Sequence, residues 1–170
     1  MILAGDIGGT KVHLALYDNV TQIRKKRYES QEFSSIEEIL SDFFKDFKDN
    51  DCKLDRACFG VAGPVINGKC SLTNLSWQVD AECLKKKLGN DAVWLINHLV
   101  ATAYSIPFLI PEDFEIIQAG TPVANGRISV VSAGTGLGQA FLIPDRHGKY
   151  TVLDSEGGHC DFSPRNKLEA

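Results

Sequence analysis

Two glycine-rich turns constrain the fold of this chain more than any other feature of its sequence. The first, residues 5–10 (GDIGGT), follows a short apolar run and precedes residues 11–17, where every second residue is apolar. The second, residues 133–138 (AGTGLG), stands between two strand-like segments, 128–132 and 139–143. A strand, a tight turn and another strand form the pattern of a β-hairpin. Each turn therefore predicts a hairpin, not a loop that leads into a helix.

Neither turn matches a standard nucleotide-binding motif. A P-loop needs a second glycine where Thr10 stands and a helix after it, and a Rossmann fingerprint would need glycine in place of Gln139. Gly8 and Gly9 nevertheless allow consecutive backbone N–H groups to face an anion, with a charge added by Lys11. One such turn is equally consistent with a plain hairpin. Two of them in succession favour phosphate binding, as in a nucleotide clamp with one turn on each side.

The hydrophobic pattern predicts a mixed α/β fold followed by the start of a second domain. Up to residue 107 the predicted order is three strands, helix, strand, helix, strand, helix, which suits a mixed sheet flanked by helices. Beyond it, short strands are separated by glycine-rich turns. We expect a small domain over residues 1–107 and the beginning of a large domain over 108–170. The predicted strands are 2–4, 11–17, 22–29, 57–62, 92–96, 114–118, 128–132, 139–143 and 150–153, and the predicted helices are 36–48, 80–88 and 99–105.

Composition is typical of a globular protein and disfavours several function classes. The chain is 44% hydrophobic and 24% charged, with a net charge of −4. Its one basic cluster, residues 24–27, is better explained as a charged edge strand than as a nucleic-acid site. The five cysteines form no C-x-x-C pair, which favours a reduced, cytoplasmic protein. No apolar run approaches the length of a membrane span, so we expect no membrane partner.

Five motifs together resemble a known family. GDIGGT at 5–10 and AGTGLG at 133–138 resemble the two phosphate motifs of the hexokinase, actin and heat-shock ATPase superfamily. TNLSW at 73–77, INH at 96–98 and EGGHCDFSP at 156–164 resemble the bacterial glucokinase family in particular. The resemblance implies an actin-like ATPase (ribonuclease H-like) fold. It also implies transfer of a phosphoryl group from ATP, with Mg²⁺, to the 6-hydroxyl of glucose in cytoplasmic glycolysis, and it leaves a homodimer open.

The resemblance also implies roles for individual residues. Asp6 would belong to the magnesium and phosphate network. Taken singly, Asn97 is explained as well by a helix cap and His159 as well by a structural histidine. The residues implied to face the phosphates are Gly5, Asp6, Ile7, Gly8, Gly9, Thr10, Gly134, Thr135 and Gly136, and those implied to bind the sugar are Asn97, His98, Glu156 and His159.

His98 departs from the family pattern, which has a catalytic aspartate at this position. A neutral imidazole can act as a general base, but it offers one acceptor instead of two and becomes a cation when it takes the proton. General-base catalysis contributes roughly 10²–10⁴-fold, so we expect ligand recognition to outlast efficient turnover. Because family members continue well past residue 170, we also expect negligible activity and weak ATP affinity from residues 1–170 alone. The alternatives are a non-catalytic sugar-binding or regulatory relative and a fragment that binds no ligand.

Overall fold

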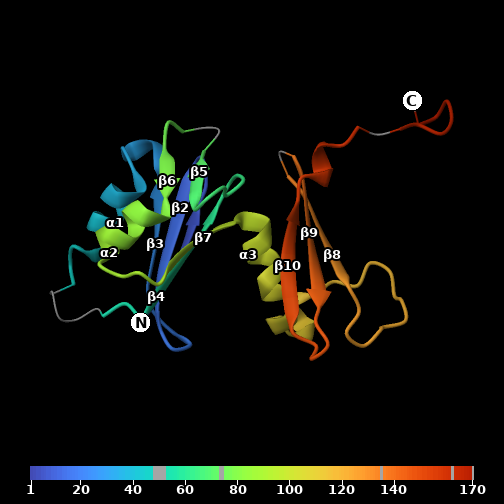
Figure 1. Cartoon of the computed structure of the whole chain (residues 1–170), viewed down its shortest axis with the longest axis horizontal. Coiled ribbons are helices and arrows are strands. Elements are labelled where there is room, and N and C mark those ends of the chain that lie inside the picture. Colours follow the sequence, from blue (N-terminus) through green and yellow to red (C-terminus); the bar gives the residue numbers. More distant parts are fainter. Residues whose placement is uncertain (48–52, 73–74, 135, 162, 170) are drawn as a thin grey trace. The chain divides into compact units, whose positions relative to one another are not determined.

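Five strands form the main sheet of the chain, with two antiparallel pairings followed by two parallel ones (Figure 1). A computed structural model describes residues 1–47, 53–72, 75–134, 136–161 and 163–169. The sheet order is β3-β2-β1-β4-β7, in which β1 pairs antiparallel with β2 and parallel with β4. The strands are β1 (Ile2–Ile7), β2 (Lys11–Asp18), β3 (Thr21–Glu29), β4 (Arg56–Val61) and β7 (Val93–Asn97).

One face of this sheet is buried beneath two helices. The register aligns Leu3 with Leu16 and Ile7 with Val12, and all four side chains are fully buried. Helices α1 (Ile36–Phe44) and α2 (Ala81–Leu88) cover that face (Figure 1), and a short hairpin of β5 (Lys69–Ser71) and β6 (Gln78–Asp80) joins the same core. Because side chains alternate along a strand, Asp6 and its cross-strand neighbour His13 lie on the opposite face.

Local signals set the ends of both helices. Ser35 caps α1 by accepting the Glu38 N–H, and the Glu38 carboxylate accepts the backbone N–H of Ser34 in return. The predicted helix start after the serine pair is confirmed. α2 begins after the Asp80 cap and ends at Gly89, whose φ of 60° lies in the left-handed region that glycine adopts without strain.

The second part of the chain forms a smaller sheet with one helix. Strands β8 (Ile128–Ala133), β9 (Leu137–Pro144) and β10 (Tyr150–Ser155) are antiparallel in the order β10-β9-β8. Helix α3 (His98–Ser105) packs its buried Ala103 against Ala140 and Leu142 of this sheet. The two turns predicted to be hairpins are therefore confirmed as connections between adjacent antiparallel strands, β1–β2 and β8–β9.

The chain divides into two compact units, Met1–His98 and Leu99–Ala170. The division precedes the domain boundary expected near residue 107 because α3 packs with the β8–β10 sheet. The assignment of residues 1–107 and 108–170 to two domains of the complete fold stays a prediction. Within the described residues, no helix is long and apolar enough to cross a membrane.

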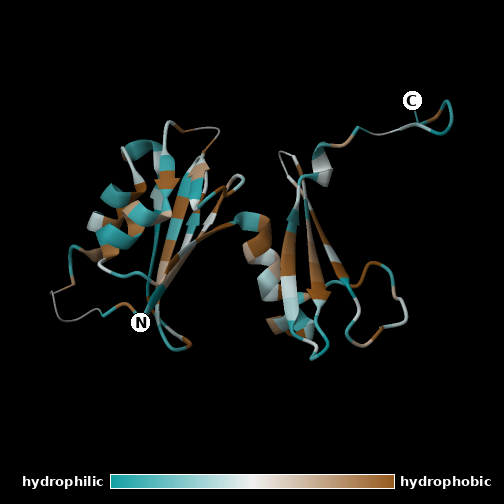
Figure 2. Cartoon of the chain, viewed as in Figure 1, coloured by the Kyte–Doolittle hydropathy of each residue, from teal (hydrophilic) through white to brown (hydrophobic). Residues whose placement is uncertain are grey.

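The strand predicted at 114–118 is wrong. This segment belongs to the long connection between α3 and β8, which shows apolar patches in Figure 2. Ile116 is 76% exposed and Ile117 is 97% exposed, so the apolar run packs against no described core. A short apolar run becomes a strand only where a partner edge completes its hydrogen bonds, and the sequence alone cannot supply that information.

Candidate functional site

The carboxyl ends of the parallel strands bring the predicted residues of the first unit together. Ile7 on β1 aligns with Val61 on β4, and Val61 aligns with Asn97 on β7. Asp6 therefore lies one residue before this edge, and His98 lies one residue after it. Ligands of α/β proteins commonly bind outside the carboxyl ends of such strands. The parallel register thus explains why residues far apart in the sequence meet here.

Asp6 and His98 form the closest polar contact at this edge. The Nε2 atom of His98 lies 2.5 Å from Oδ1 of Asp6, and Nδ1 of His13 lies 3.6 Å from Oδ2 of the same carboxylate. A hydrogen bond from His98 is the main cause of a lowered Asp6 pKa, which partial burial opposes and which the charges of both histidines reinforce. Each oxygen of the Asp6 carboxylate therefore faces an imidazole.

Asn97 is held by the loop that follows β4. Its side-chain amide donates a hydrogen bond of 3.0 Å to the Gly63 carbonyl oxygen. Because the Asn97 backbone ends β7 and α3 begins at His98, Asn97 occupies the position before the helix that the cap interpretation required. The amide nitrogen is directed to the Gly63 carbonyl, in the loop after β4. This contact orients the side chain at the edge that carries Asp6 and His98.

The first glycine turn is a two-residue hairpin loop. Gly8 N–H donates to the Lys11 carbonyl at 2.9 Å, which closes the loop formed by Gly9 and Thr10. Among the described residues, the backbone N–H groups of Gly9 and Thr10 have no hydrogen-bond partner. These donors are of the kind that binds phosphate oxygens.

Gly5 and Ile7 have a packing role that the motif alone did not reveal. A Cβ atom on Gly5 would lie 2.3 Å from Cδ1 of Phe59, whose ring is fully buried. The Ile7 side chain is also fully buried. Only the backbone of either residue could contact a ligand. Their predicted part in phosphate binding stays a prediction.

A buried serine, Ser30, donates two hydrogen bonds to the first glycine turn. The Ser30 hydroxyl donates to the Gly8 carbonyl at 3.0 Å, and the Ser30 backbone N–H donates to the Thr10 carbonyl at 2.9 Å. Ser30 is the one buried polar residue in the part of the chain that the structure describes. It sits directly after β3 and starts a short 3₁₀ helix, Ser30–Glu32.

In the second unit, the second glycine turn joins β8 to β9. Gly134 N–H donates to the Gly136 carbonyl at 2.9 Å. A Cβ atom built on either glycine would meet nothing within 4 Å, so the space around both is open. Thr135, the remaining predicted phosphate residue, lies outside the described residues.

Glu156 and His159 lie together beside the strand that follows this turn. His159 Nε2 is 3.3 Å from Glu156 Oε2, and both side chains are largely exposed. The 3₁₀ helix Gly157–His159 packs tightly on β9, since a Cβ atom on Gly158 would lie within 1.6 Å of the Leu137 carbonyl oxygen. The structure therefore places the predicted sugar-binding pair next to the second glycine turn, with both side chains open to solvent.

The possible metal-binding side chains near the first turn suit a metal ion whose ligands come mainly from the substrate. No group of three or more described His, Cys, Asp or Glu residues could hold a metal ion by itself. Mg²⁺ is usually bound by one or two carboxylates together with substrate phosphates and water. Asp6 is the one carboxylate beside the first turn that was predicted for this role.

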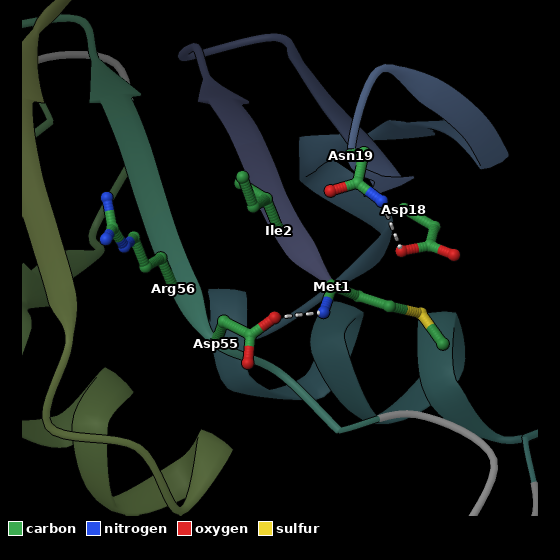
Figure 3. Close-up of a pocket in the computed structure, with 6 residues that line it drawn as sticks. All are labelled: Met1, Ile2, Asp18, Asn19, Asp55 and Arg56. Atoms are coloured by element: carbon green, nitrogen blue, oxygen red, sulfur yellow. Dashed lines mark hydrogen bonds and ion pairs between the residues drawn. The ribbon is translucent and has the colours of Figure 1, made fainter.

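A separate concavity of about 390 Å³ lies where β1 begins (Figure 3). The Met1 amino group is 2.6 Å from Oδ2 of Asp55, and this contact lowers the Asp55 pKa. Asp6 lies near the other end of β1, so this concavity is distinct from the predicted site. Its lining consists of Met1, Ile2, Asp18, Asn19, Asp55 and Arg56, none of which the sequence motifs predicted.

Sequence reasoning missed two residues of the site. His13 could have been found, because a hairpin centred on Gly9 and Thr10 pairs it with Asp6. Ser30 carries no comparable signal, since a single serine after a charged strand is unremarkable in sequence. Its position depends on how β3 ends beside the turn.

Comparison with known proteins identifies the family. A family model described as Glucokinase matches residues 3–170. The chain belongs to the glucokinase family. A glucokinase from Nostoc punctiforme is 40% identical over 174 aligned residues, and one from Synechocystis is 38% identical over 179. These alignments cover 99% and 98% of this chain and 50% of each relative, so the chain spans about half the length of the curated relatives it matches.

Solved glucokinase structures share the fold. The crystal structure of a glucokinase from an Antarctic psychrotroph superposes with a TM-score of 0.83 at 31% identity, covering 99% of this chain and 53% of that one. A Balamuthia mandrillaris glucokinase in complex with glucose gives a TM-score of 0.76 at 21% identity, with 98% and 50% coverage. At that identity the second likeness shows the fold alone. The fold of the glucokinase chain is α/β, of the actin-like ATPase type, as the motifs predicted.

Proposed function

We propose that this chain carries the first phosphate turn and the sugar-binding edge of an ATP-dependent glucokinase of cytoplasmic glycolysis. The observation that carries the proposal is the convergence of Asp6, Asn97 and His98 at the carboxyl edge of β1, β4 and β7, beside the Gly9–Thr10 loop. Related proteins support the ligands. The Balamuthia glucokinase was solved with glucose, and a glucokinase from Streptomyces griseus was solved with glucose and AMPPNP.

Each predicted group has a role that its chemistry suits. The N–H groups of Gly9 and Thr10, which have no partner among the described residues, would bind phosphate oxygens. The turn at Gly134 and Gly136 is proposed for the same role, with the Gly134 N–H already donating to the Gly136 carbonyl. Asn97 would bind a sugar hydroxyl, as would the Glu156–His159 pair. Buried or oriented polar groups reject a sugar whose hydroxyls leave them unpaired, by roughly 10⁴-fold or more.

Asp6 is the proposed protein member of the Mg²⁺ and phosphate network at the first turn. When bound, Mg²⁺ supplies positive charge that neutralises the transferring phosphoryl group. The chain's own contribution is the carboxylate at the end of β1, with His13 and His98 beside it. The nucleotide phosphates and water would complete the metal's ligands.

His98 is the proposed acceptor of the sugar hydroxyl proton, and its contact with Asp6 limits that role. A ring nitrogen that faces a carboxylate is not available to take a proton from a hydroxyl. Nε2 could therefore act as a base only after it turns away from Asp6. We expect phosphoryl transfer to be slow for this reason.

The same contact favours a second candidate function. A chain that binds glucose through Asn97, Glu156 and His159 without transferring phosphate would be a sugar-binding or regulatory relative. The observation that favours it is the contact between Asp6 and His98, at the position where the resemblance implies a catalytic aspartate. The two candidates share ligands and differ in turnover.

Calorimetry beside a coupled turnover assay tests the proposal. We expect residues 1–170 to bind glucose and Mg-AMPPNP weakly and to turn over negligibly, and Asn97→Ala to weaken glucose binding. Asn166→Ala, at an exposed position outside the predicted site residues, is the control. Turnover by the protein extended to the length of its relatives supports the kinase. Glucose binding without turnover in that longer protein supports the second candidate, and binding of neither ligand contradicts both.

A further inference from the structure

We infer that Ser30 is a positioning residue that aims the backbone donors of the first glycine turn at a phosphate group. The inference rests on the proposed function, because it assigns the means by which the turn is oriented. Ser30 lies outside every motif of the chain. It is fully buried, and both of the hydrogen bonds that it donates run to carbonyl oxygens of the turn.

Because peptides are planar, these two hydrogen bonds fix the directions in which the Gly9 and Lys11 N–H groups point. The carbonyl of one residue and the N–H of the next belong to one planar trans peptide, so they point in opposite directions. The Ser30 hydroxyl holds the Gly8 carbonyl at 3.0 Å, which turns the Gly9 N–H away from Ser30. The Ser30 N–H holds the Thr10 carbonyl at 2.9 Å, which turns the Lys11 N–H away as well.

The turn has no other described restraint of this kind. Gly8 N–H donates to Lys11 at the base of the loop, but neither Gly9 nor Thr10 donates a backbone hydrogen bond to a described residue. A glycine at position 9 has many accessible conformations, so its peptide would rotate freely without an external contact. The Ser30 hydroxyl supplies that contact through the Gly8 carbonyl, and the Ser30 side chain is fully buried.

Burial makes the hydroxyl hard to replace. Alanine at position 30 would leave the Gly8 carbonyl without its buried donor, and a buried carbonyl left without a partner is costly. The carbonyl would then rotate toward water and take the Gly9 N–H with it. The backbone bond to Thr10 would remain, so the fold of β3 and β2 should persist while the turn loses its orientation.

Nuclear magnetic resonance on the 170-residue chain tests the inference without a ligand. We expect Ser30→Ala to shift the Gly9 amide resonance and to speed its hydrogen exchange by tenfold or more, while amides in the centres of β1 and β2 keep their protection. Ser30→Thr keeps the hydroxyl and should restore the Gly9 resonance. Ser41→Ala, which removes a hydroxyl bonded to the Glu37 carbonyl in α1, is the matched control.

A titration with Mg-AMPPNP on the same samples tests the link to phosphate. We expect about three- to tenfold weaker binding for Ser30→Ala, and unchanged binding for Ser30→Thr and Ser41→Ala.

An unshifted Gly9 resonance in folded Ser30→Ala overturns the inference, and so does undiminished nucleotide binding by that variant. If the unmodified chain binds no nucleotide, the proposed function fails there, and the ligand-free Gly9 measurement still decides whether Ser30 orients the turn. Should Ser30→Ala unfold, Ser30→Cys, of similar size with a weaker donor, takes its place in both measurements.

Discussion

His98 lies against Asp6, with 2.5 Å between Nε2 of the imidazole and Oδ1 of the carboxylate. The two residues come from strand ends separated by β4, and the parallel register brings them together. The resemblance to glucokinases implies an aspartate at this position, and an aspartate beside Asp6 would make a pair of like charges instead of a carboxylate–imidazole contact. The substitution therefore changes the electrostatics of the edge as well as the identity of the base.

Replacing His98 by aspartate should increase turnover in the protein extended to the length of its relatives. The carboxylate restores a base that ends the reaction neutral, and it releases Asp6 from the imidazole. We expect a gain of roughly 10²–10⁴-fold in kcat, measured by a coupled assay. His98→Asn removes the ion pair without supplying a base, so it should give little gain. No difference between the two variants would contradict the assignment of position 98 to proton transfer.

The glycine turns and the antiparallel pairing of β1 with β2 could be predicted from sequence because both depend on local information. Alternation in β2 and the turn at Gly9 define a hairpin whose register follows from its length, and this already pairs Asp6 with His13. The parallel pairing that brings His98 to Asp6 is not local. It depends on the crossovers through α1 and α2, and the sequence analysis did not predict it.

The exposed apolar segment at 114–118 shows the limit of pattern reasoning. Its composition suits a strand, but strand formation requires a partner edge and a covered face. Ile117 has neither among the described residues and is 97% exposed. Gly158 shows the converse, because its tight fit against the Leu137 carbonyl is invisible in sequence. Tertiary neighbours decided both positions.

Asp42 should make the stability of the first unit sensitive to acid. Hydrogen bonds from Lys26 at 2.5 Å and from Lys45 at 2.7 Å hold the Asp42 pKa well below its ordinary value of 3.8. Because the folded pKa is lowered, these contacts stabilise the fold above pH 3.8 and their contribution is lost as pH falls through the folded pKa. Urea unfolding midpoints measured between about pH 7 and pH 2 should show this loss.

Asp42→Asn isolates that effect. The variant should be less stable than the unmodified chain at neutral pH, and its midpoint should fall less steeply in acid, so the two curves converge. Asp46→Asn is the comparison variant, because Asp46 has one partner, Arg24, and a 63% exposed side chain. The urea midpoint of Asp46→Asn should fall as steeply in acid as that of the unmodified chain. Parallel acid limbs for Asp42→Asn and the unmodified chain would show that the Lys26 contact does not matter to stability.

Gly5→Ala should destabilise the first unit through packing. The added methyl group would lie 2.3 Å from Cδ1 of the buried Phe59 ring, so the ring or β1 must move. Overpacking of this kind costs about 1–3 kcal/mol, measurable as a lower urea midpoint. Combining it with Phe59→Leu should recover part of the loss, because the smaller side chain makes room. If the double variant is as unstable as the sum of the single ones, the two sites do not interact and the packing explanation fails.

Gly158→Ala should displace the Glu156–His159 pair. A methyl group there would lie within 1.6 Å of the Leu137 carbonyl oxygen, which belongs to the backbone and cannot rotate away as a side chain would. The 3₁₀ helix must therefore lift from β9, and we expect a loss of about 1–3 kcal/mol in the stability of the second unit. Gly120→Ala is the matched control, since an added methyl group at that position meets nothing within 4 Å. Amide shifts of Leu137 and His159 report the displacement directly.

Because Glu156 and His159 are proposed to bind the sugar, Gly158→Ala should also weaken glucose binding, whereas Gly120→Ala should leave it unchanged. A Gly158→Ala chain with unaltered shifts at both positions would show that β9 accommodates the methyl group without moving the pair.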